Sequence, residues 1–113
     1  MRPAPRLRAL TERRPGDPTP LAAVVNFGPV ILPELASLGV TTVAQLERLG
    51  AAEVLRRWVE RYPERLNLHA AVALVATLEG APWTRISPGG KASARRIIAE
   101  LRTEFLGGAR RGG

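Results

Sequence analysis

The amino-acid sequence predicts an all-α protein, a single compact domain of five or six short helices. Apolar residues recur at helical spacing, as in Val54, Leu55, Trp58 and Val59, and no segment alternates with period two over more than a few residues. Aromatic residues make up 4% of a chain that is 45% hydrophobic, so Leu, Val and Ala must build the core, a mix that favours helices. At 113 residues the chain is long enough for one domain.

The two ends of the chain differ from its middle in composition. Residues 1–19 combine five arginines with repeated proline, and residues 107–113 contain only Gly, Ala and Arg. We therefore expect a disordered basic, proline-rich tail at 1–19, a folded helical domain at 20–106 and a flexible Gly/Arg tail at 107–113. The net charge is +7, and the two tails hold most of that excess. Basic tails of this kind usually give solubility and a weak, salt-sensitive attraction to polyanions.

Glycine, proline and capping residues divide the domain into helices. Gly39 can adopt the left-handed conformation that closes a helix, and Gly50 is a second helix stop. Thr42 and Gln45 have the spacing of a capping box, in which each side chain accepts a hydrogen bond from a backbone amide. We expect a short helical segment at 21–25, a turn at 26–29 and a first helix that ends at 38. Four further helices are expected at 43–49, 51–62, 68–78 and 88–105.

The second half of the domain contains two further caps and a tryptophan. Asn67 is a good N-cap for the helix over 68–78, which is apolar almost all round and therefore the expected central core helix. Ser87, followed by a proline, is the N-cap of the last helix. Trp83 lies in the loop between these two helices, and we expect it to fill the edge of the core with its indole N–H paired.

The sequence lacks the side chains that a catalytic or metal site requires. It contains no cysteine and one histidine, His69, which we expect to be a neutral residue at the edge of the core. The run Gly89-Gly90-Lys91 resembles a phosphate-binding loop, but Arg85 stands where that loop needs glycine. We therefore expect no enzyme, no metal, no cofactor and no small-molecule substrate.

The sequence also predicts a cytoplasmic protein. The absence of cysteine is typical of intracellular chains. The N-terminal residues lack the apolar core of a signal peptide, and the longest weakly polar stretch, 68–78, is far shorter than the roughly 20 residues that cross a bilayer.

Nucleic acid is one candidate partner. A helix, a tight glycine turn and a second helix surround Asn26 and Gly28, and in a helix-hairpin-helix element the backbone amides of such a turn approach a DNA phosphate. The alternative is a purely structural turn, since Pro29 offers no N–H. DNA binding would be favoured if the helix-borne basic residues gathered beside this hairpin; these are Arg56, Arg57, Lys91, Arg95 and Arg96.

Nearly the whole predicted domain, about residues 20–101, resembles the C-terminal domain of the TfoX/Sxy competence regulators. The resemblance rests on the order and spacing of a set of short motifs. These are Asn26-Phe27-Gly28-Pro29, Leu35 with Gly39-Val40-Thr41-Thr42-Val43-Ala44-Gln45-Leu46, Leu49-Gly50-Ala51, Leu66-Asn67-Leu68, Leu78-Glu79-Gly80-Ala81 and Trp83.

The resemblance implies a helix-hairpin-helix-like or sterile-alpha-motif-like (SAM-like) domain with a role, direct or through a partner, in regulating genes linked to DNA uptake. TfoX proteins also carry an N-terminal α/β domain, which residues 1–19 are too short to form, so we expect a stand-alone bacterial C-terminal domain. Val30 and Ile31 stand where the family often has a polar or basic residue. Our leading hypothesis is a non-enzymatic regulatory module that binds an unidentified protein through an exposed helix face; the alternative is low-specificity DNA binding through the hairpin and the basic tails.

Overall fold

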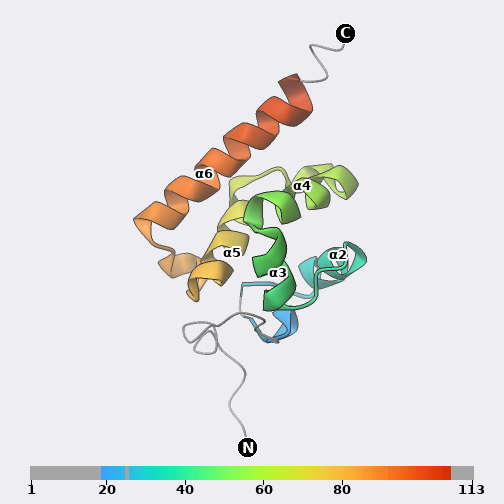
Figure 1. Ribbon diagram of the computed structural model, residues 1–113, viewed down its shortest axis with the longest axis vertical. Helices are drawn as coiled ribbons and strands as arrows, with labels where there is room; N and C mark the ends of the chain where they lie inside the picture. Colours follow the sequence, from blue (N-terminus) through green and yellow to red (C-terminus); the bar gives the residue numbers. More distant parts are fainter. Residues whose placement is uncertain (1–18, 25, 108–113) are drawn as a thin grey trace, which may run out of the picture.

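The computed structural model describes residues 19–24 and 26–107, so the predicted tails lie, apart from their innermost residues, outside the described part. The described chain is all-α, as predicted, and its only β pairing is one isolated antiparallel bridge between Pro20 and Thr42. Five α-helices follow one another, and short 3₁₀ turns lie before the first of them, between α4 and α5, and between α5 and α6 (Figure 1). The elements are η1 (Leu21–Ala23), α2 (Ile31–Ser37), α3 (Val43–Leu49), α4 (Ala51–Arg61), η2 (Pro63–Arg65), α5 (Leu68–Glu79), η3 (Trp83–Arg85), α6 (Pro88–Arg102) and the π-helical turn η4 (Thr103–Gly107).

Three of these elements differ from the expected ones at their ends or in type. The first segment is a 3₁₀ turn that ends at Ala23, and Val25 lies outside the described residues. The last α-helix ends at Arg102, where the chain widens into the π-helical turn instead of continuing to Phe105. Trp83 begins a 3₁₀ turn where a loop was expected.

Local hydrogen bonds explain where the helices begin and end. The Gln45 amide donates to the Thr42 hydroxyl while the Gln45 side chain accepts from the Thr42 amide, so the capping box is present. Asn67 and Ser87 accept from the amides of Ala70 and Gly90, each at 2.8 Å. These side chains satisfy amides at the helix N-termini that have no partner within the helix.

Gly39 closes α2 in the left-handed conformation, with φ of 83°. Its amide donates to the Ala36 carbonyl, and the Val40 amide donates to the Leu35 carbonyl at 3.0 Å. This is the Schellman arrangement, and it turns the chain so that the buried Val40 enters the core with Leu35. Gly50 also has positive φ and separates α3 from α4.

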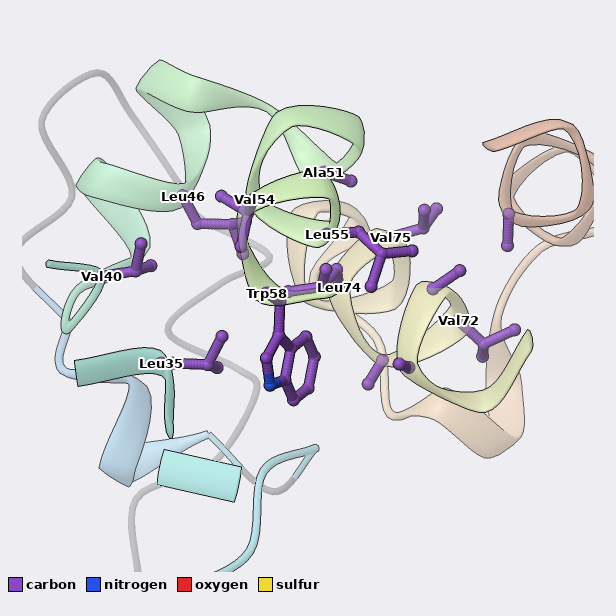
Figure 2. Packing of buried hydrophobic residues seen from close by; sticks show 14 of the residues in the cluster. Leu35, Val40, Leu46, Ala51, Val54, Leu55, Trp58, Val72, Leu74 and Val75 are labelled. Atoms are coloured by element: carbon purple, nitrogen blue, oxygen red, sulfur yellow. The ribbon is translucent and has the colours of Figure 1, made fainter. Parts of the chain in front are cut away.

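The core is organised around α5. Its residues from Ala70 to Thr77 are all buried, because α3, α4 and α6 pack around it. Figure 2 shows side chains of α2, α3, α4 and α5 pointing into one cluster, with Trp58 of α4 as its largest member. Trp58 is therefore the tryptophan that fills the core.

The last helix, α6, lies along one side of the bundle and packs on α5 (Figure 1). Its buried residues follow one another at intervals of four and three, which places them on a single face. They are Gly90, Ala94, Ile98 and Leu101. The two sides of α6 that flank this face remain available for other contacts.

Candidate functional site

Asn26, the centre of the predicted DNA hairpin, is a buried structural residue. Its side-chain amide donates to the Thr77 hydroxyl and to the Ala81 carbonyl, each at 3.0 Å, and its carbonyl oxygen accepts from the Trp83 amide at 2.7 Å. Its side chain is 8% exposed, and no described non-glycine residue has positive φ. The hydrogen-bonding groups of the Asn26 side chain are therefore used inside the protein.

The first amides of α2, which follow the hairpin, also have partners within the protein. The Gly28 carbonyl accepts from the amides of Ile31 and Leu32, both at 3.1 Å, so the first turn of α2 is satisfied internally. Gly28 does not have positive φ, and an added Cβ would have nothing within 4 Å. The backbone conformation and the packing of the protein therefore do not require glycine at this position.

Arg56 and Arg57, two of the predicted nucleic-acid contacts, form ion pairs on α4. Arg56 contacts Glu53 at 2.7 Å and Glu60 at 3.0 Å, and Arg57 contacts Glu53 at 2.8 Å. The hydrogen bonds from Arg56 and then Arg57 lower the pKa of Glu53 to about 2. A weaker contact of 4.0 Å joins Arg56 to Glu104 beyond the end of α6. These two cations are neutralised by neighbouring carboxylates.

Lys91, Arg95 and Arg96 are exposed on α6 and have no ion pair with any residue of the described chain. Lys91 and Arg95 are one turn apart and lie on one side of the helix, whereas Arg96 points away from the buried face. The acidic residues Glu100 and Glu104 lie on the opposite side, toward α4. The predicted basic residues are thus divided between α4 and α6.

A groove lies between the start of α5, η3 and the start of α6, and we call it the Trp83 groove. It has a volume of about 450 Å³. Two of its walls are exposed large apolar side chains, Leu68 at 37% and Trp83 at 44% exposed. The lining residues are Leu68, His69, Val72, Trp83, Thr84, Ile86 and Lys91.

The exposure of Trp83 corrects the expectation that it fills the edge of the core. Only its backbone is tied inward, by the hydrogen bond to Asn26. The 3₁₀ turn that follows Pro82 directs the ring outward, where it meets His69 edge to face with ring centroids 5.0 Å apart. Within the described residues the indole N–H has no hydrogen-bond partner.

His69 is also exposed, because it lies in the first turn of α5 on the side that faces η3. It borders both the Trp83 groove and a smaller cavity of about 280 Å³ beneath α2, which is lined in part by Asn26, Phe27 and Trp58. His69 was expected at the edge of the core, but it lies on the surface beside Trp83.

One group of polar residues escaped the sequence analysis. The Glu34 carboxylate accepts two hydrogen bonds from the Arg65 guanidinium and one from the Trp58 indole N–H, all at 2.8 Å. The hydrogen bond from Arg65 lowers the pKa of Glu34, and the Arg65 guanidinium lies 5.7 Å from the centre of the Trp58 ring. This cluster joins α2, α4 and η2 and belongs to the fold.

A second groove of about 590 Å³ lies between α4 and α6, and we call it the α4–α6 groove. Its floor is apolar and includes Val75, Leu78 and Leu101. Its rim carries Arg56 with Glu53 and Glu104, which already pair with one another. The one cation in the lining of this groove, Arg56, is therefore paired, and the lining as a whole is acidic because it also contains Glu100.

The described residues hold no group of three or more His, Cys, Asp or Glu side chains that could bind a metal ion. The start of α6, where the sequence resembles a phosphate loop, already receives a carboxylate: the Ser87 amide and hydroxyl both donate to Glu79, at 3.0 and 2.5 Å. No helix in the described part of the chain is long and apolar enough to span a membrane.

Comparison with known proteins identifies a family. The sequence model of the TfoX C-terminal domain matches residues 18–96, which is most of the chain. This match confirms the resemblance stated from the residues. No curated protein and no solved structure matches the chain.

Proposed function

The chain belongs to the TfoX C-terminal domain family, and we propose that it is a non-enzymatic helical module that binds another protein in the regulation of competence or transcription. The Trp83 groove is the surface that we assign to this binding. The observation that carries the assignment is the exposed Trp83 ring beside the exposed Leu68. Aromatic residues are enriched in protein interfaces and often contribute most of the binding free energy.

The groove is also held in a fixed shape before any partner arrives. Asn26 ties the backbone of η3 to α5 through Thr77, so the ring of Trp83 is displayed from an anchored turn. The Ser87–Glu79 hydrogen bonds fix the start of α6 against the end of α5. A preformed surface loses little conformational entropy on binding, which favours a recognition role.

The proposal is tested by site-specific photo-crosslinking in the native cells. A benzophenone amino acid replaces Thr84, an exposed residue of the Trp83 groove, or, in the control, Ala52, an exposed residue of the α4–α6 groove. We expect Thr84 to give discrete protein adducts and Ala52 to give none. Adducts from Ala52 alone would place the partner on the other groove, and adducts from neither position would contradict a protein-binding role.

A further inference from the structure

The cations of the described chain fall into two groups that differ in their surroundings. Arg56, Arg57 and Arg65 are paired with glutamates at 2.7 to 2.8 Å. Lys91 and Arg95 have no carboxylate partner in residues 19–24 and 26–107, and Lys91 lines the Trp83 groove. Lys91 and Arg95 therefore lie at or beside this groove without a carboxylate, whereas Arg56 and Arg57 of α4 are compensated by glutamates.

Two neighbouring features add to the positive potential of the groove. Arg85 ends η3, next to the groove residues Thr84 and Ile86, is exposed, and likewise has no ion pair in the described chain. The first turns of α5 and α6, which supply Leu68 and Lys91, contain no acidic residue. Helix N-termini carry a partial positive charge, so the start of α5 reinforces the cations around the apolar walls, whereas the start of α6 already receives the Glu79 carboxylate.

We infer that the Trp83 groove binds an acidic peptide segment that carries one or two large apolar side chains. This inference rests on the proposed function and names the class of partner. The apolar side chains of the peptide pack on Leu68, Val72 and Trp83, while its carboxylates lie near Lys91, Arg85 and Arg95. A groove of about 450 Å³ lies in the size range of pockets that enclose small ligands, so it holds a few side chains and not a domain.

The geometry favours a peptide over a nucleic-acid strand. Single-stranded nucleic acids bind to several aromatic platforms that follow a continuous positive channel. Here one indole ring is exposed, His69 packs against it, and the other apolar lining residues, Leu68, Val72 and Ile86, are aliphatic. Charge complementarity with carboxylates needs only the few cations at the rim.

The test begins with selection of random twelve-residue peptides displayed on phage against the full chain. We expect the enriched peptides to combine an excess of Asp and Glu with Leu, Ile, Phe or Trp. Enrichment of neutral or basic peptides, or of none, overturns the inference. Non-acidic peptides that still require Trp83 would overturn the acidic class alone and leave the proposed function standing.

The best enriched peptide is then synthesised and its affinity measured by fluorescence anisotropy. Trp83→Ala is expected to weaken binding about 30-fold, the loss typical of a central interface residue. The double variant Lys91→Glu/Arg95→Glu is expected to weaken it about tenfold at low salt, because two attractions become repulsions. Arg96→Glu is the matched control, a charge reversal on the outward side of the same helix, and should change affinity less than about twofold.

Two results of this titration would overturn the inference even if peptides are enriched. One is an unchanged affinity in the Lys91→Glu/Arg95→Glu variant when circular dichroism shows the native helix content. The other is displacement of the peptide by a 15-nucleotide oligo(dT) at equal concentration, which would assign the groove to a nucleic-acid strand. Affinity that falls as the salt is raised from 50 to 500 mM is the expected outcome.

Discussion

Asn26 and Trp83 are neighbours in space with different tasks. Asn26 makes three hydrogen bonds inside the protein, one of them to the backbone amide of Trp83. Trp83 contributes that amide to the fold but places its ring on the surface. The side chain of Asn26 therefore stabilises the folded protein, and the side chain of Trp83 is available to bind a partner.

The first prediction concerns Asn26→Ala. The substitution leaves the Thr77 hydroxyl, the Ala81 carbonyl and the Trp83 amide without their partner, so we expect a loss of roughly 2–4 kcal/mol in the free energy of unfolding. Urea unfolding followed by circular dichroism measures it. Trp83→Ala, which keeps the backbone amide, serves as the comparison and should lose less than about 1 kcal/mol. Equal losses in the two variants would contradict this division of tasks.

The second prediction concerns the pH dependence of stability. The pKa of Glu53 is lowered from 4.5 to about 2 in the folded protein, chiefly by the hydrogen bond from Arg56. Its stabilising contribution is therefore complete above about pH 4.5 and is lost as the pH falls toward 2. Glu34, whose pKa is lowered by Arg65, acts in the same direction.

Urea unfolding at several pH values between 7 and 2.5 measures this effect. We expect the free energy of unfolding to fall below pH 4.5, and to fall less steeply in Glu53→Gln than in the unmodified protein. Glu100→Gln is the control, because Glu100 is an exposed glutamate without an ion pair in the described chain. A slope that Glu53→Gln leaves unchanged would show that this carboxylate does not carry the acid sensitivity.

The residues that act locally could be predicted from the sequence, and those that act over long separations could not. The Thr42–Gln45 capping box and the caps Asn67 and Ser87 work within three residues, so their spacing reveals them. Glu34 and Arg65 are 31 positions apart, and Asn26 and Trp83 are 57 apart. No periodicity connects such pairs, which is why Asn26 was interpreted as a hairpin residue.

At the scale of elements, α6 has two chemically different sides. One side carries Lys91 and Arg95 and borders the Trp83 groove, while the other carries Glu100 and Glu104 and borders α4. The existence and start of this helix were predictable from Ser87-Pro88 and its apolar stripe. Which neighbour each side faces depends on the packing of α5 against α6, and that was not predictable.

The third prediction concerns two adjacent glycines at the start of α6. An added Cβ at Gly90 would overlap the Glu79 carboxylate and Ile86, whereas at Gly89 it would meet only the Ser87 hydroxyl, at 3.9 Å. We expect Gly90→Ala to destabilise the protein by roughly 1–2 kcal/mol, because Ile86 must shift and the Glu79 carboxylate must leave its hydrogen bonds to Ser87. Gly89→Ala should be neutral or stabilising by up to about 1 kcal/mol, since alanine favours helix.

Thermal unfolding of the two alanine variants, side by side, provides the measurement. Both variants replace glycine with alanine in the first turn of the same helix, so the gain in helix propensity is the same in the two proteins and cancels in the comparison. A Gly90→Ala protein as stable as Gly89→Ala would mean that the contact between the α5 end and the α6 start is not close-packed.

At the scale of the whole molecule, charge and apolar exposure coincide at one place. Arg56 and Arg57 of α4 are paired with glutamates, while the exposed Trp83 and Leu68 lie beside the unpaired Lys91. The all-α class was predictable because apolar spacing and glycine positions are properties of the sequence itself. Which cations are paired with carboxylates depends on which helices pack together, and the sequence does not reveal that. The net charge therefore suggested a nucleic-acid partner but could not indicate which surface would bind it.

The most direct test of the central claim combines the Thr84 photo-crosslink with Trp83→Ala. We expect this variant to keep its free energy of unfolding within about 1 kcal/mol and to lose the protein adducts seen from Thr84. Adducts of undiminished yield in the folded Trp83→Ala protein would contradict the claim that this ring is the binding element.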